Sequence, residues 1–124
     1  MPVLLAPIAA THGVGDAQFT SLATPSRGSS DTSVWRVVLT PSHPPTPHSL
    51  TREEVFVVLS GRGRVVLGDE LYEAGPGDTI VVPPTTPFAL AAIGDLPFEA
   101  ICCMPVGGAA QLPDGTTFVP PWAL

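Results

Sequence analysis

The chain has 124 residues, 44% of them hydrophobic, a composition that excludes an intrinsically disordered protein and fits one domain with one core. A formal net charge of −6 and the absence of lysine exclude a basic surface for nucleic acid and exclude Schiff-base chemistry. Sixteen prolines and twelve glycines interrupt many short apolar runs, which favours an all-β architecture over a helical bundle.

Residues 1–23 are predicted to form an N-terminal arm. Its apolar part, residues 2–10, lacks the basic residues of a secretory signal, and no apolar run reaches membrane-spanning length. This part would pair either with the sheet of a second subunit, giving a homodimer, or with its own barrel, and both alternatives stay open. A weak alternation over residues 17–22 favours a short edge strand, and the polar run 24–33 favours a loop.

Short strands separated by turns are predicted for the barrel core, residues 33–105. In residues 34–40 the side chains of Trp35, Val37 and Leu39 share one face. The other core strands are expected at residues 54–59, 64–67, 71–74, 79–82, 88–92 and 97–104. With the edge strand, about eight to ten strands and at most one helix predict a small double-sheet jelly roll.

The last segment, residues 106–124, shows no periodicity and is predicted to be a tail, anchored by Trp122 against the barrel exterior. The adjacent Cys102 and Cys103 point to opposite faces of a strand, so we expect two free thiols. Free thiols and the missing signal favour a cytoplasmic protein with no membrane partner. The absence of lysine and asparagine, whose codons are A-rich, hints at a GC-rich bacterial genome.

Two motifs flank the runs at residues 54–59 and 79–82. The first, HSLTREEVFVVLSG over residues 48–61, places His48 six residues before Glu54 and ends on a glycine. The second, GPGDTIVVPPTTPFAL over residues 75–90, has a Gly-Asp turn before its strand and proline after it. This spacing resembles the cupin superfamily, whose motifs are His-x-His, three or four residues, Glu, six residues, Gly, and then Gly, five residues, Pro-x-Gly, two residues, His. The resemblance implies a cupin barrel, also called a double-stranded β-helix.

In cupins the three histidines and the glutamate of these motifs bind a metal ion. This chain keeps His48 and Glu54, whereas Leu50 and Phe88 stand at the second and third histidine positions. Two ligands would hold a transition metal weakly, so we expect no metal and no other cofactor. The alternative is a site of His43, His48 and Glu54, the three-ligand minimum of a catalytic metal centre.

Glu54 is the best candidate for acid/base chemistry. Alternation along the strand places Glu54, Phe56 and Val58 on one face, which lines the barrel interior in cupins. Burial among apolar side chains would raise the pKa of the carboxyl group, as acid/base catalysis at neutral pH requires. His48 would assist. The alternative is a structural carboxylate, or one solvated beside Glu53.

The apolar replacements at the ligand positions suggest a pocket for a small apolar molecule. The alternative is a barrel interior filled by its own side chains. An inward Arg36 would bind a carboxylate or polarise an enol oxygen. For both Arg36 and Arg64, however, the pattern favours a side chain that faces solvent, because arginine is rarely buried unless paired. The predicted substrate-binding residues are Arg36, Leu50, Phe56, Val58, Ile80, Val82, Phe88 and Leu90.

The leading hypothesis is therefore a metal-independent enzyme that cyclises or isomerises a largely apolar, polyketide-like biosynthetic intermediate. Its class follows from the resemblance, because small single-domain cupins of this kind often accompany biosynthetic enzymes. Two alternatives are a module that binds a small ligand without turnover and a metal-dependent, dioxygenase-like cupin.

Overall fold

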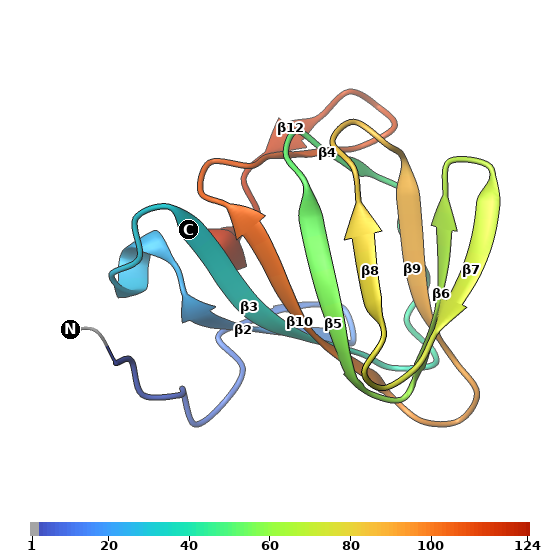
Figure 1. Cartoon of the computed structure of the whole chain (residues 1–124), viewed down its shortest axis with the longest axis horizontal. Coiled ribbons are helices and arrows are strands. Elements are labelled where there is room, and N and C mark those ends of the chain that lie inside the picture. The colour runs from blue at the N-terminus through green and yellow to red at the C-terminus, as the bar shows by residue number, and fades with distance from the viewer. Residues whose placement is uncertain (1–2) are drawn as a thin grey trace.

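The computed structural model describes residues 3–124, and its elements are almost entirely antiparallel strands (Figure 1). The strands are β1 (His12–Val14), β2 (Ala17–Ala23), β3 (Thr32–Leu39), β4 (Ser49–Leu50), β5 (Glu54–Ser60), β6 (Arg62–Leu67), β7 (Glu70–Ala74), β8 (Thr79–Val82), β9 (Phe88–Ile93), β10 (Phe98–Pro105), β11 (Ala110–Gln111) and β12 (Thr117–Phe118). Two single-turn 3-10 helices, η1 (Pro25–Arg27) and η2 (Pro121–Ala123), complete the described elements. The all-β jelly-roll prediction is confirmed.

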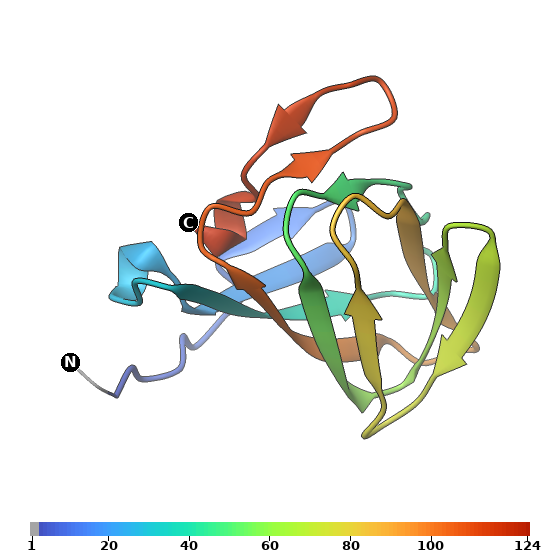
Figure 2. The same cartoon turned by 45° about the horizontal axis from the view of Figure 1, so that its top comes forward.

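Three sheets form the barrel. A six-stranded sheet has the order β1-β2-β3-β10-β5-β8, and a three-stranded sheet has the order β7-β6-β9. The third sheet, β12-β11-β4, lies across one end of the barrel (Figures 1 and 2). Consecutive strands in the large sheet come from distant parts of the chain, because β10 pairs with both β3 and β5.

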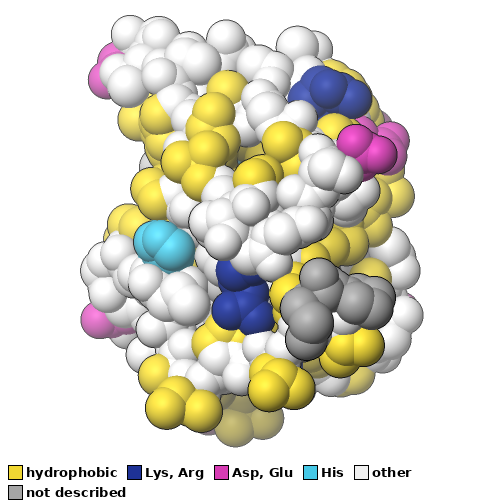
Figure 3. Space-filling model, turned by 90° about the vertical axis from the view of Figure 1, so that its left-hand side faces the viewer, with side chains coloured by type: hydrophobic (Ala, Val, Ile, Leu, Met, Phe, Trp, Pro, Cys, Tyr) yellow, Lys and Arg dark blue, Asp and Glu magenta, His cyan; other side chains and the backbone are white. Residues whose placement is uncertain are grey.

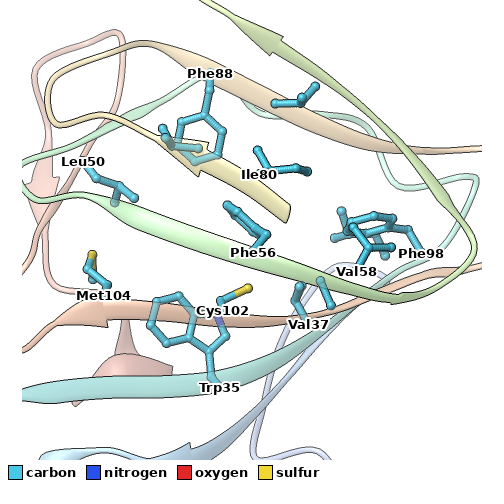
Figure 4. Packing of buried hydrophobic residues seen from close by; sticks show 14 of the residues in the cluster. Trp35, Val37, Leu50, Phe56, Val58, Ile80, Phe88, Phe98, Cys102 and Met104 are labelled. Carbon is cyan, nitrogen blue, oxygen red and sulfur yellow. The ribbon is translucent and has the colours of Figure 1, made fainter. Parts of the chain in front are cut away.

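The inner face of the large sheet is built by strict alternation. Along β10 every second side chain is buried, and Cys102 lies opposite Trp35 on β3 and Phe56 on β5. Ile80 continues this row on β8, opposite Phe56. Figure 4 shows the members of this row pointing into the barrel, toward Phe88 on the other wall. The period-2 pattern thus places one apolar stripe across the sheet.

One end of the barrel is filled by Phe98, which is fully buried. A Cβ atom on Gly63 would lie 2.6 Å from the Phe98 ring, so only glycine lets the ring occupy this space. Val58 lies beside Phe98 (Figure 4). The interior is therefore packed solid here, and any cavity must lie toward the other end.

Both ends of the chain contribute strands to the sheets. Part of the N-terminal arm joins its own barrel, since β1 and β2 extend the large sheet. Within the segment predicted as a tail, β11 pairs with both β4 and β12. Its backbone hydrogen bonds to other segments stabilise strands that have no local periodicity. Among residues 3–124 no helix is long and apolar enough to cross a membrane.

Candidate binding and catalytic pocket

A cavity of about 510 Å³ lies inside the barrel, at the end that the β12-β11-β4 sheet covers. Its wall combines the inner face of the large sheet with β4, β9, the loop before β4 and the C-terminal segment. Of the predicted residues, this wall includes His43, His48, Leu50, Glu54, Phe56, Phe88 and Leu90. The volume is in the range of small-molecule sites.

Glu54 is the acidic residue in this wall. Its side chain is 5% exposed, at the first position of β5 opposite Val82. Within residues 3–124 no side chain or backbone group donates a hydrogen bond to its carboxyl group, and burial alone raises the pKa of Glu54 to about 8. Because desolvation penalises the charged form, Glu54 carries its proton at neutral pH and releases it only at slightly higher pH.

His48 is held in one orientation at the edge of the cavity. Its backbone exchanges two hydrogen bonds with Phe88, of 3.0 and 2.8 Å, and its ring lies 4.4 Å from the Phe88 ring. The ring Nδ1 lies 2.8 Å from the carbonyl oxygen of Thr46. Since a carbonyl only accepts hydrogen bonds, Nδ1 carries the proton, and Nε2 is the free acceptor.

Aromatic side chains dominate the remaining wall. Phe19 and Trp122 stack with ring centres 3.7 Å apart and planes 8° apart. Phe56 meets Phe88 edge-on at 6.2 Å. The aromatic residues of the wall are Phe19, Trp35, Phe56, Phe88, Phe118 and Trp122, which are six of the eight in the chain.

Four predicted substrate-binding residues lie outside the cavity wall. Val58, Ile80 and Val82 are buried in the core, as their alternation requires, but they are packed against other side chains. Arg36 lies on the opposite face of β3 from Trp35, where its Nε is 3.3 Å from Oε1 of Glu99 in an ion pair. The expectation that Arg36 binds substrate is therefore corrected: the strand pleat turns its side chain away from the pocket.

Several wall residues were missed by the sequence reasoning. Trp35, Val37 and Leu39 were assigned a common face, and the alternation that defined this face could have placed them inside. Cys102 also lines the cavity, and burial, with a smaller effect of Glu54, raises the pKa of its thiol well above the usual range. Trp122 lies in the wall and not on the barrel exterior, a placement for which the tail carries no local signal.

The residues present do not fit the metal centre of a cupin. Two of its four ligand positions carry Leu50 and Phe88, which have no donor atoms. His43, His48 and Glu54 border one cavity, yet residues 3–124 contain no group of three His, Cys, Asp or Glu side chains placed to hold a metal ion.

A curated relative, an uncharacterized protein of Methanocaldococcus jannaschii, is 43% identical over 53 residues, which are 43% of this chain and 42% of that protein. The chain thus spans less than half the length of the relative.

Solved structures share the fold at low sequence identity. A cupin-like protein from Thermotoga maritima has a TM-score of 0.69 at 22% identity, with 77% of each chain covered. The 7S globulin of Momordica charantia has a TM-score of 0.72 at 20% identity, over 86% of this chain and 36% of that one. The polyketide cyclase RemF from Streptomyces resistomycificus has a TM-score of 0.68 at 22% identity, over 82% and 72%.

The family described as "Cupin domain" matches residues 35–104, which begin within β3 and end within β10. This match covers more than half of the chain and contains both motifs. The resemblance seen in the sequence is confirmed, and the chain belongs to the cupin domain family.

Proposed function

We propose that this cupin is a metal-independent enzyme that cyclises or isomerises a largely apolar small molecule by acid/base catalysis inside the barrel. The observation that carries the proposal is Glu54, a buried carboxyl group without a hydrogen-bond partner in the described residues, in the wall of an apolar cavity. RemF, which has the same fold, is a polyketide cyclase, and this supports a polyketide-like substrate.

Ring closure and double-bond migration both need a proton removed at one carbon and returned elsewhere. Glu54, with its pKa of about 8, can hold a proton or accept one near neutral pH. The free Nε2 of His48 would take or relay the second proton. The aromatic walls would hold the substrate in a folded shape and exclude water.

The proton-transfer step can be tested with nitrobenzisoxazole, an aromatic carbon acid. A carboxylate base removes its ring C–H proton, the N–O bond breaks, and a coloured cyanophenolate forms without any other reactant. We expect a rate that rises with pH up to and through about 8, as Glu54 ionises. Glu54→Gln should lower this rate by about 10²-fold or more.

Glu53→Gln is the matched control, because Glu53 precedes Glu54 but is exposed and outside the wall. It should keep the full rate, and a chelator should leave the rate of the wild type unchanged. A folded Glu54→Gln variant with the wild-type rate would refute the role of Glu54. Loss of the rate with chelator would favour the metal-dependent alternative.

A second candidate is a ligand-binding module without turnover. The observation that favours it is the lack of a second carboxyl group in the described wall, since acid and base roles are commonly shared by two such groups. In that case the probe reaction stays at the buffer rate, although small apolar molecules bind.

A further inference from the structure

The charge distribution of the pocket wall is one-sided. Apart from His43 and His48, Glu54 is the only ionisable oxygen or nitrogen group among the described wall residues. The five arginines, Arg27, Arg36, Arg52, Arg62 and Arg64, all lie outside this wall, and the chain contains no lysine. A ligand with a carboxylate or phosphate would therefore meet a carboxyl group and no fixed cation.

The walls also have the composition that attracts a cation. Aromatic ring faces carry negative partial charge, and an ammonium or guanidinium group within about 6 Å of a ring centre is attracted to it, more strongly when water is excluded. Six aromatic side chains border this cavity, from β2, β3, β5, β9, β12 and η2. They line the same cavity as Glu54, which stands at the first position of β5 opposite Val82.

The Glu54 carboxyl group has no donor to pair with inside residues 3–124. A buried carboxyl group without a partner is costly, and a molecule in the cavity can supply the missing donor. A protonated amine supplies both a hydrogen-bond donor and a positive charge.

We propose that the ligand of this pocket is a small aromatic or alicyclic amine, whose protonated nitrogen pairs with Glu54 while its rings pack between the aromatic walls. An amine of this kind would be the substrate class of the enzyme proposed above, and it shares with that proposal only the location of the site. Binding measurements test it without any assay of catalysis.

The effect of ligand charge can be measured with three probes of similar shape, which are cationic, neutral and anionic: 4-phenylbenzylamine, 4-phenylbenzyl alcohol and 4-phenylbenzoate. Trp35 and Trp122 are the chain's two tryptophans and both line the cavity, so intrinsic fluorescence reports binding. At pH 7.5 we expect the amine to bind at least about tenfold more tightly than the alcohol, and the benzoate most weakly.

Variants measure separately how much the Glu54 carboxyl group and the aromatic rings contribute to the affinity for the amine. Glu54→Gln should weaken the amine about tenfold and change the alcohol less than about threefold. Phe88→Leu should weaken the amine more than the alcohol, because the ring face is lost while the apolar volume is nearly kept. Arg36→Gln, outside the pocket, is the control and should leave all three affinities unchanged.

Equal affinity of wild type for amine and alcohol overturns the inference, as does tighter binding of the benzoate. An equal loss of amine and alcohol in Glu54→Gln also overturns it, because the carboxyl group then has no specific partner. These outcomes are independent of the nitrobenzisoxazole reaction above. Selective amine binding without proton transfer would refute only the catalytic proposal. Proton transfer without selective amine binding would refute only the inference of an amine ligand.

Discussion

The Glu54 side chain enters the folded state without an ion-pair or hydrogen-bond partner in the described chain, so its protonation is coupled to folding. Its folded pKa is about 8, against an ordinary value of 4.5. Between these two values the unfolded chain has lost the proton while the folded chain keeps it. The unfolded state therefore binds fewer protons, and stability falls as pH rises through this window.

We expect this group alone to lower the free energy of unfolding by up to about 1.4 kcal/mol per pH unit between about pH 4.5 and 8, and by nothing further above it. Urea unfolding of wild type and Glu54→Gln at a series of pH values measures the difference. The two curves should diverge across the window, with the variant relatively more stable at high pH. Parallel curves would show that Glu54 is solvated or paired in the folded protein.

At the residue scale, the sequence motifs predicted the pocket only in part. Leu50, Phe56 and Phe88 line the cavity because the motif spacing and strand alternation set the direction of each side chain. Alternation does not say how far along the barrel a side chain lies. Val58 was therefore predicted in the pocket, although it lies beside Phe98 in the packed end (Figure 4).

At the scale of elements, the C-terminal segment is held by three serine hydroxyl groups. Ser21 donates to the carbonyl of Trp122 over 2.8 Å, and Ser33 donates to that of Ala123 over 2.6 Å. Ser26 donates to the carbonyl of Leu124 over 2.7 Å. Ser21 and Ser33 are buried, so these bonds fix the backbone that presents Trp122 to the cavity.

Ser33→Ala should lower the free energy of unfolding by about 1–3 kcal/mol, because the buried carbonyl of Ala123 loses its donor. Loosening of this segment should also weaken amine binding, since Trp122 forms part of the wall. Urea unfolding and the fluorescence titration check the two effects. Ser29→Ala is the control: its hydroxyl bonds the nearby Thr32 carbonyl in an exposed turn, and both effects should be smaller. Unchanged stability in Ser33→Ala would contradict the role of the serine.

Strands with regular alternation were predicted well, and those without it were not. The expected strand 79–82 coincides with β8, and 34–40 overlaps β3 (Thr32–Leu39). The pair β11 and β12 has two residues in each strand, too few for a period to be seen. Such short strands depend on hydrogen bonds to β4 and to each other, which only the folded chain provides.

For the whole molecule, the predicted homodimer concerns the arm that precedes β1. Leu5 is 83% exposed and Ile8 is fully exposed, and the Leu5 carbonyl accepts a hydrogen bond from Arg27. Figure 3 shows the side of the molecule that faces left in Figure 1, where apolar side chains form several patches and charged side chains are few. Exposed apolar groups on one face are typical of a contact between protein chains.

We expect light scattering to give twice the 12.8 kDa mass of one chain, with the arm as the contact between copies. Leu5→Asp with Ile8→Asp should give a monomer. The control is Val57→Asp with Val81→Asp, which introduces the same two charges at exposed apolar residues on the outer face of β5 and β8. This double variant should stay dimeric. A monomeric wild type, or a dimer broken only by the second pair, would count against the arm.

The adjacent thiols of β10 lie on opposite sides of one wall: Cys102 borders the cavity, and Cys103 is half-buried on the outer face. A thiol reagent therefore labels one sulfur from solvent and reaches its neighbour only through the interior. The ratio of the two labels, read from a single peptide by mass spectrometry, measures how often the barrel admits a molecule of the reagent's size. Occupancy by any ligand should protect the inner sulfur while the outer one serves as the internal standard.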